Sequence, residues 1–587
     1  MSADAQEPSW AEDAVDAAGG PDVLLTDAAL GITNRLRPDG SLLRLAAGLA
    51  RRPELAVREA AKLGAELGRI AAGRSGLAPG PRDRRFADPA WTGNALLRRS
   101  VQAYLAAAQS AEALLAGAEL GWRDDTRLKF LLGNLVAAAA PSNNPLLSPA
   151  AWKALIDTGG GSALRGLQAF ATDLADPPRV PSMVTAGAFE VGRDLAVTPG
   201  AVVYSAEQFE LIQYQPATET VCRYPLLIVP PMINKYYIVD LAPGRSMAEF
   251  LVGQGHQVFV MSWRNPDARH RDWNLDTYGG AIVAALAAAR AIAGEPKASV
   301  LALCSGGIAT AMVAAHLSVA GRLGELASLG LGVAVLDQCP AGGSGGVVPP
   351  GQQRPGTAGA VIDEKTAAAA MAVSDARGYL DGAALAEVFA WLRPEDLIWN
   401  YWVNNYLQGQ PPPPFDILYW NADTTRLPAA LHHDFIRLGL ANALTAAEVA
   451  TMLGSPVDLS KVDTDAYVIA GVADHLCPWQ SCYRTTQLLG GQVKFVLSTS
   501  GHIAAMVNPP GNPKAAFRTA PPDGAQPNPA DPEEFLAAAQ TVPGSWWTDY
   551  SSWLAQRSGG QKKSPGQPGR KGYPVQSAAP GTYVHDH

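Results

Sequence analysis

Cysteine is scarce in this 587-residue chain. The five cysteines are an odd number and too few for a disulfide framework in a chain of this length: Cys222, Cys304, Cys339, Cys477 and Cys482. This scarcity favours a reducing, cytoplasmic environment. His and Cys do not recur at the spacing of a zinc site, and Cys477 with Cys482 lacks a second pair of ligands, so the sequence predicts no metal.

Long apolar runs, a secretion signal and an excess of positive charge are also absent. The opening MSADAQEPSWAEDAVDA is acidic, and no run of about 18 apolar residues occurs, so we expect neither export nor a transmembrane segment. The net charge of -8 argues against nonspecific binding of nucleic acid. No Gly-rich phosphate-binding pattern follows an expected strand, and we therefore expect no cofactor.

Changes in composition and in the spacing of apolar residues along the chain predict four parts. Residues 1–30 are acidic and Ala-rich without a sustained period, which indicates a mobile leader. Residues 31–190 carry Leu and Ala at helical spacing and predict an all-helical N-terminal domain. Residues 191–556 predict a catalytic domain, and the basic, turn-rich residues 557–587 predict a loosely held C-terminal tail.

The catalytic region alternates short apolar runs with helical stretches. Helices are expected at 277–294 and 306–323, and strands at 225–230, 256–263, 298–304, 327–337, 465–471 and 493–498. Continuous apolar strands of this kind are typical of a sheet buried on both faces. The fold class predicted is therefore α/β, with a mostly parallel sheet.

Between about 338 and 450 the alternation of apolar strand runs and helical stretches ends. A Gly/Pro-rich stretch leads into an aromatic segment, which indicates a cap, or lid, inserted over the carboxyl edge of the sheet. Its aromatic residues could exclude water from a reaction or contact an apolar product: Trp399, Tyr401, Trp402, Tyr406, Phe415, Tyr419 and Trp420.

The stretch LALCSGGI (301–308) has the pattern of a nucleophile elbow. A strand-to-helix turn of this kind needs small residues two before and two after the nucleophile, and Ala302 and Gly306 flank Cys304 in that way. Ser305 is the rival nucleophile, but Leu303 would collide in its turn. The alternative without a catalytic role is that Cys304 is a small buried residue at the end of a strand.

An acid and a histidine follow the cysteine in the chain order of α/β-hydrolase triads. Asp474 comes after the strand at 465–471, and His502 after the strand at 493–498. His502 is expected to take the thiol proton while Asp474 holds its other ring nitrogen. Asp337 and Asp267 are competing carboxylates, of which Asp337, at a strand end, is the stronger.

The remaining candidates support this constellation. His475 is adjacent to Asp474 and is expected to have a supporting or structural role. The backbone N–H groups of Ser305 and Ile233 are the expected donors of an oxyanion hole. The other histidines considered are expected to be ordinary core or surface residues: His256, His270, His316, His432 and His433.

Many sequence blocks resemble poly(3-hydroxyalkanoate) synthases, from about residue 86 to the C-terminus. They include VPPMINKYYIVDL, SWRNPDARHRDWNLDTY, LALCSGG, DLIWNYWVNNYLQG, GVADHLCPW, TSGHIAAMVNPPGNPKA and GSWWTDYSSWL. RDWNLDTY and FDILYWNADTTRLPAA are closer to the medium-chain group, which acts without a second synthase subunit. Ala302, where the family has glycine, and the Gly/Pro-rich stretch near 340–360 depart from the family pattern.

The resemblance implies a role for several residues and a reaction. It implies Cys304 as the acyl-bearing nucleophile, His502 as general base and Asp474 as its partner, on an α/β-hydrolase fold. It also implies that Trp420 lies near the active site or a subunit contact, although a tryptophan in an aromatic segment is as often a core residue. The implied substrate is an (R)-3-hydroxyacyl-CoA, and the product is a polyester stored in cytoplasmic granules. The implied active form is a homodimer.

Two other functions share parts of this pattern. A thioesterase or polyester depolymerase would use the same fold and triad, normally with serine at the elbow. A granule-coating scaffold protein would keep the fold without the chemistry. The cysteine at the elbow favours the synthase.

Overall fold

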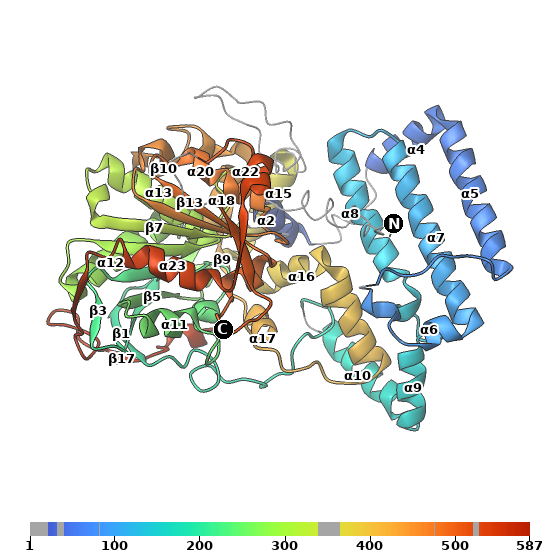
Figure 1. Cartoon of the computed structure of the whole chain (residues 1–587), viewed down its shortest axis with the longest axis horizontal. Helices are drawn as coiled ribbons and strands as arrows, with labels where there is room; N and C mark the ends of the chain where they lie inside the picture. The colour runs from blue at the N-terminus through green and yellow to red at the C-terminus, as the bar shows by residue number, and fades with distance from the viewer. Residues whose placement is uncertain are drawn as a thin grey trace. The chain divides into compact units, whose positions relative to one another are not determined.

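The computed structural model describes residues 21–31, 40–81, 83–175, 177–338, 364–474, 476–520 and 528–587 (Figure 1). The chain divides into two compact units. The helical unit contains residues 30–185 and 383–414. The catalytic unit contains residues 19–29, 186–382 and 415–587.

The helical unit confirms the expected helical N-terminal region. Asn94 begins the longest helix, because its side chain accepts hydrogen bonds from the backbone N–H groups of Leu96 and Leu97. Phe86, Trp91 and Val101 form a small core beside it. The helices before residue 185 are α4 (Gly40–Arg51), α5 (Pro53–Ala71), α6 (Ala90–Gly93), α7 (Ala95–Gly117), α8 (Trp122–Ala138), α9 (Pro149–Asp157) and α10 (Gly161–Ala175).

The predicted cap at 338–450 is not a single insertion. Residues 383–414, which include most of α16 (Gly382–Leu392) and the π-helical segments η6 (Glu395–Trp399) and η7 (Trp402–Leu407), belong to the helical unit. The ring centroids of Trp402 and Tyr406 lie 5.9 and 5.2 Å from that of Phe170 on α10. The Trp402 indole also donates to the Asn143 carbonyl oxygen. These aromatic residues therefore build a core with helices far earlier in the chain.

An eleven-stranded sheet forms the centre of the catalytic unit. Its strand order is β15–β14–β13–β12–β7–β6–β4–β5–β2–β1–β17. The six strands from β13 to β5 pair in parallel, and the strands beyond them on both sides pair antiparallel. The parallel strands are β4 (Leu226–Val229), β5 (Val258–Trp263), β6 (Ala298–Leu303), β7 (Leu326–Gly332), β12 (Ala466–Gly471) and β13 (Val493–Ser498).

These six strands are the six that the apolar runs predicted, so the mostly parallel α/β core is confirmed. One boundary differs: the run at 327–337 leaves the sheet at Gly332, because Val333 adopts a φ of 45° that ends the extended backbone. The sequence did not predict the antiparallel strands β1 (Gly200–Ser205), β2 (Phe209–Tyr214), β14 (Ala516–Thr519), β15 (Gln540–Pro543) and β17 (Ser577–Ala578).

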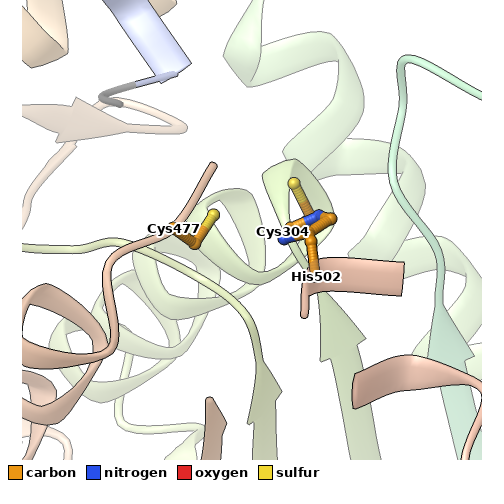
Figure 2. A group of neighbouring side chains, drawn as sticks. All are labelled: Cys304, Cys477 and His502. Carbon is orange, nitrogen blue, oxygen red and sulfur yellow. The ribbon is translucent and has the colours of Figure 1, made fainter. Parts of the chain in front are cut away.

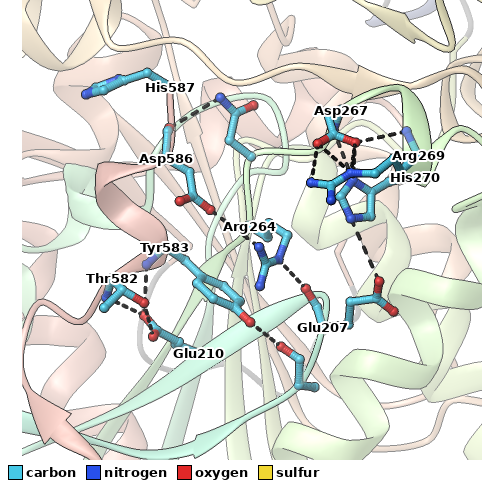
Figure 3. Close-up of polar contacts among 12 residues, drawn as sticks. Glu207, Glu210, Arg264, Asp267, Arg269, His270, Thr582, Tyr583, Asp586 and His587 are labelled. Carbon is cyan, nitrogen blue, oxygen red and sulfur yellow. Dashed lines mark hydrogen bonds and ion pairs between the residues drawn. The ribbon is translucent and has the colours of Figure 1, made fainter.

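The tail at 557–587 is bound to the sheet, not loosely held as predicted (Figure 3). β17 pairs with β1, and the Glu210 carboxylate on β2 accepts the backbone N–H groups of Thr582 and Tyr583 at 2.8 and 3.0 Å. The Arg264 guanidinium lies 3.9 Å from the centroid of the Tyr583 ring. Polar groups on β2 and after β5 thus hold a segment whose own composition suggested mobility.

Helices cover the sheet, among them α12 (Leu275–Ala293) and α13 (Ser305–Val319), which pack on β4 and β6 and on each other. Within the described part of the chain, α12 alone has the length and apolar composition of a membrane span, but 56% of its most apolar window is buried. Its contacts make it a helix of the sheet's covering layer. A helix late in the chain also covers this sheet: α23 (Trp546–Ala555) packs Tyr550 on Tyr467 of β12.

The predicted mobile leader is only partly described, since residues 1–20 lie outside the described residues. Residues Pro21–Leu30 form a helix, α2. Leu25 and Ala28 are buried, and the Leu25 carbonyl oxygen lies 3.1 Å from Nε2 of the buried His432. The Leu and Ala side chains of this acidic segment therefore supply enough apolar surface to fix it, which corrects the prediction for residues 21–30.

Shorter elements complete the catalytic unit. The helices are α11 (Met247–Gly253), α15 (Glu364–Arg377), α17 (Asp416–Ala422), α18 (Ala429–Ala441), α19 (Trp479–Tyr483), α20 (Thr485–Leu488), α21 (His502–Met506) and α22 (Pro532–Ala538). Three two-stranded pairs join β3 (Thr220–Cys222) with β16 (Gln561–Lys563), β8 (Tyr379–Leu380) with β9 (Leu427–Pro428), and β10 (Thr451–Met452) with β11 (Ser455–Pro456).

Candidate active site

Cys304 stands at the turn between β6 and α13. Its backbone has φ 49° and ψ -122°, a conformation that residues with a side chain rarely adopt. The Cys304 carbonyl accepts the backbone N–H groups of Gly307 and Ile308, so the residue caps the start of the helix. As a whole residue Cys304 is partly exposed, whereas Cys222, Cys477 and Cys482 are buried. A strained, accessible position at a helix N-terminus is the geometry of a nucleophile elbow.

Small residues around Cys304 allow this turn to form. A methyl group on Gly306 would lie 2.5 Å from the Pro230 carbonyl oxygen and 2.9 Å from that of Val229, at the end of β4. A methyl group on Gly307 would lie 2.6 Å from the Ala334 side chain. Ala302 is fully buried. Larger side chains at these positions would push the helix away from the sheet.

Ser305, the rival nucleophile, has another use. Its buried hydroxyl accepts a hydrogen bond from the backbone N–H of Met232, 3.0 Å away. Met232 belongs to the loop after β4, so this bond ties that loop to the first residue of α13. The geometry thus directs Ser305 into the scaffold and leaves Cys304 as the exposed group.

His502 and Asp474 meet beside the elbow. His502 is the first residue of α21, and its Nδ1 lies 2.7 Å from Oδ2 of Asp474. The other oxygen of Asp474 accepts the backbone N–H groups of Leu476 and Cys477, each at 2.9 Å. Because Nδ1 faces the carboxylate, Nε2 is the nitrogen left to face the Cys304 sulfur.

The competing carboxylates are held elsewhere. Oδ2 of Asp337 lies 3.1 Å from Nε of Arg484, and Oδ1 accepts the Asn442 side-chain amide. Asp267 caps the short helix η4 (Ala268–His270) and pairs with Arg269. The other histidines have structural partners: His256 contacts Ser551, His270 the Asp267 backbone, His316 Ser455, His432 Ser374, and His433 the Met371 carbonyl.

Cys477 joins the site although the sequence did not assign it there. The sulfurs of Cys304 and Cys477 and a ring nitrogen of His502 all lie within 4.8 Å of one another (Figure 2). Cys477 is buried on the loop that carries Asp474. The signal was its position three residues after Asp474, where the side chain of an aspartate often bonds the backbone and turns the chain back toward itself.

The three groups perturb one another's ionisation. The hydrogen bond from Cys477 and the ring of His502 hold the pKa of Cys304 down to about 5, against the opposing effect of burial. Burial alone would lower the pKa of His502, but the Asp474 carboxylate and the Cys304 sulfur together raise it to about 10. Donation to Cys304, together with burial, raises the pKa of Cys477 well above its ordinary value. The favoured state near neutrality is a thiolate–imidazolium pair beside a neutral thiol.

The loop after β4, where Ile233 was predicted to supply an oxyanion donor, is fixed at several points. The Met232 carbonyl accepts the Thr425 hydroxyl at 3.2 Å. The Lys235 carbonyl accepts the indole N–H of the buried Trp420, which lies on α17, at 2.7 Å. Ile233 thus lies between two anchored residues, and Trp420 is bonded to the loop on which Ile233 lies. His475 and Cys339 lie outside the described residues.

Comparisons with known proteins agree with this site. The family model for the N-terminus of poly-beta-hydroxybutyrate polymerase (PhaC) matches residues 82–251, and that of the alpha/beta hydrolase fold matches residues 225–509. Poly(3-hydroxyalkanoate) polymerase 1 of Ectopseudomonas oleovorans is 44% identical over 536 residues, which cover 91% of this chain and 92% of the relative. The chain belongs to the poly(3-hydroxyalkanoate) polymerase family. As a member of this family it is an acyltransferase on an α/β-hydrolase fold.

Further polymerases extend the match. Poly(3-hydroxyalkanoate) polymerase 2 of Ectopseudomonas oleovorans is also 44% identical, over 89% of this chain and 90% of its own length. The polymerase subunit PhaC of Cupriavidus necator is 39% identical, over 86% of this chain and 84% of its own length. The resemblance to poly(3-hydroxyalkanoate) synthases found in the sequence blocks is therefore confirmed.

Proposed function

We propose that the chain polymerises (R)-3-hydroxyacyl-CoA thioesters into a polyester, with release of CoA, through an acyl group carried on Cys304. The single observation that carries this proposal is the position of His502, which joins Asp474 at 2.7 Å and the Cys304 sulfur within 4.8 Å. A histidine placed in this way can move a proton between a thiol and a substrate.

The first step loads the enzyme. The Cys304 thiolate adds to the thioester carbonyl, and the resulting oxyanion is stabilised by the backbone N–H groups of Ser305 and Ile233. The carbon–sulfur bond to CoA then breaks, and the CoA sulfur takes its proton from the His502 imidazolium. Asp474 stabilises the positive ring before this transfer and keeps the proton on Nδ1 afterwards.

The second step lengthens the chain by one ester. The 3-hydroxyl of another substrate gives its proton to Nε2 of His502 while its oxygen attacks the acyl carbon on Cys304. The carbon–sulfur bond to Cys304 breaks, and the thiolate is restored. The lengthened chain, now a CoA thioester, returns to Cys304 by the loading step.

A cysteine suits this cycle better than a serine. Exchange of an acyl group between two thiols is nearly thermoneutral, so the acyl group on Cys304 stays activated for transfer to a hydroxyl. An oxygen ester on serine would lie lower in energy and give up part of that driving force. The Ser305 hydroxyl, which is bonded to Met232, does not compete for the acyl group.

Product analysis with (R)-3-hydroxyacyl-CoA tests the proposal. We expect CoA release by the purified protein to match the monomer incorporated into polymer, and labelled acyl groups to be trapped on Cys304. Free hydroxy acid without polymer would instead identify a thioesterase or depolymerase. CoA release retained in full by Cys304→Ala would reject every covalent mechanism through this sulfur. Absence of CoA release from the natural protein would favour the scaffold interpretation.

The proposal extends to partners and place. We propose that the enzyme acts in the cytoplasm as a homodimer on the surface of polyester granules. Apolar side chains stand exposed on α9 and α10 of the helical unit: Trp152, Ile156, Leu164, Leu167 and Leu174. Ile156 is 73% exposed and Leu167 65%. An apolar polymer surface would cover such side chains and remove them from water.

A further inference from the structure

Cys477 is a thiol that the proposed reaction does not consume. Its sulfur, the Cys304 sulfur and a ring nitrogen of His502 lie within 4.8 Å of one another. Figure 2 shows the three side chains coming from separate segments, the start of α13, the loop after β12 and the start of α21. The cluster therefore depends on tertiary folding and not on a local sequence motif.

A second acyl carrier is the first role to consider for Cys477. An acyl carrier must present a thiolate to the substrate, but the nearby Cys304 sulfur and burial both raise the pKa of the Cys477 thiol well above its ordinary value. Nucleophilic attack by Cys477 is therefore disfavoured. The Cys477 sulfur can instead act as a soft metal ligand, because it lies beside the Cys304 sulfur and a ring nitrogen of His502.

We propose that Cys304, Cys477 and His502 form a binding site for a thiophilic divalent cation, such as zinc or cadmium, and that the bound ion reversibly blocks the nucleophile. Two thiolates and an imidazole are the ligands that such ions prefer. With bonds of about 2.3 Å to sulfur and 2.0 Å to nitrogen, donors in a tetrahedral site lie roughly 3.5–3.8 Å apart. The donors of this cluster, which lie within 4.8 Å of one another, need to approach by at most about 1.3 Å to reach that geometry.

The protons balance without an added reagent. Cys304 is already a thiolate in the favoured state, so binding releases the thiol proton of Cys477 and the Nε2 proton of His502 to solvent. Nδ1 keeps its proton and its bond to Asp474, and this carboxylate–histidine arrangement orients the ring toward the ion. Three protein ligands leave the fourth tetrahedral position for water.

Occupation of this site would stop the proposed reaction, since the ion takes both the nucleophile and the base. Binding itself requires no substrate and no turnover. It can therefore be tested on the full chain whether or not the proposed polymerase cycle is correct. Cys477 is the ligand that distinguishes the ion site from the catalytic pair, because the acyl transfer needs only Cys304 and His502.

Titration of the metal-free, reduced protein with cadmium tests the inference. We expect one equivalent to bind with sulfur-to-cadmium charge-transfer absorption, and zinc to compete for the same site. Since loss of even an outer partner of a metal ligand costs about 10- to 100-fold in affinity, Cys477→Val should weaken binding by more than about tenfold. The absorption per bound ion should fall to about half that of the natural protein, because one thiolate remains in place of two.

Two further variants complete the experiment. Cys304→Ala removes the other sulfur and should weaken binding in the same way, so the result does not depend on one variant's folding. Cys222→Ala changes a buried thiol on β3, outside the cluster, and should bind cadmium like the natural protein. Equal affinity and equal absorption in the natural protein and Cys477→Val would overturn the inference, even if polymer synthesis proceeds as proposed.

Discussion

The Ser305 hydroxyl accepts the backbone N–H of Met232 across a distance of 3.0 Å. This bond links the helix behind the nucleophile to the loop that should stabilise the oxyanion. The residue next to the nucleophile thus holds a second part of the site in place.

Ser305→Ala should slow acyl transfer while leaving the triad in place. Without the hydroxyl, Met232 loses its partner and the predicted oxyanion donor of Ile233 is less firmly positioned. We expect kcat to fall by about tenfold, a part of the 100- to 1,000-fold effect of losing an oxyanion donor outright. As a matched control, Ser328→Ala removes a buried hydroxyl bond between β7 and β6 and should leave kcat unchanged.

Asp474→Asn should nearly abolish turnover in a folded protein. The amide can stabilise the wrong tautomer of His502 and cannot support a positive ring, an effect of about 10,000-fold in kcat for comparable triads. Asp267→Asn, which alters one of the two competing carboxylates considered from the sequence, should stay within about twofold of the natural rate, since polar changes at exposed side chains are usually mild. Steady-state kinetics of both variants would decide the assignment, and equal losses would contradict it.

The reactivity of Cys304 should rise at a lower pH than that of an ordinary cysteine. Its pKa is lowered to about 5, so the thiolate is present above that value and is lost as the pH falls through it. The imidazolium of His502, whose pKa is raised to about 10, is lost as the pH rises through that value. Alkylation of Cys304 by iodoacetamide should therefore already be fast at pH 6.

Cys477→Val should move that profile upward, because the hydrogen bond from Cys477 is the largest influence that lowers the pKa of Cys304. The rate of alkylation, followed by mass spectrometry, should reach half its maximum at a higher pH than in the natural protein. Cys222→Ala provides the control for removing a buried thiol. An unmoved midpoint would show that Cys477 does not donate to Cys304.

Trp420→Phe should affect the site through the loop after β4. The substitution removes the indole bond to the Lys235 carbonyl and leaves a buried acceptor unpaired, which costs about 1–3 kcal/mol. We expect a lower free energy of unfolding by denaturant and a lower kcat at unchanged KM. Trp399→Phe is the control, since the buried indole N–H of Trp399 has no hydrogen-bond partner among the described residues.

Polar substitutions on α9 and α10 should weaken attachment to polyester. The double variant Ile156→Ser with Leu167→Ser removes two exposed apolar side chains from the helical unit, and its share in the granule pellet after centrifugation should fall. CoA release in solution should persist, because neither residue belongs to the catalytic unit. Val575→Ser, at an exposed apolar residue of the tail, should sediment like the natural protein.

The sequence predicted the parallel core because strands buried on both faces are continuous apolar runs. It did not predict β2, where Glu210 and Gln213 interrupt the apolar pattern. These polar residues bind the tail: Glu210 accepts Thr582 and Tyr583, and Gln213 accepts the backbone N–H of Gly569. A local pattern cannot show partners more than 350 positions away.

The candidate site was also predicted only in part. The order of Cys304, Asp474 and His502 identified three groups that the structure brings together. The sequence did not assign Cys477 to the site because a triad does not include a second thiol. The closeness of the Cys477 sulfur to Cys304 depends on how the loop after β12 turns. The aromatic segment was taken for a lid because its composition gives no sign of its partner Phe170.

The assignment of residues 383–414 to the helical unit means that the chain passes between the units more than once. Deleting everything before residue 186 would remove Phe170 and Asn143 but leave Trp402 and Tyr406 without the surfaces that they cover. We expect such a shortened enzyme to aggregate for this reason, whatever its chemistry. Chimaeras between relatives should therefore exchange both pieces of the helical unit together.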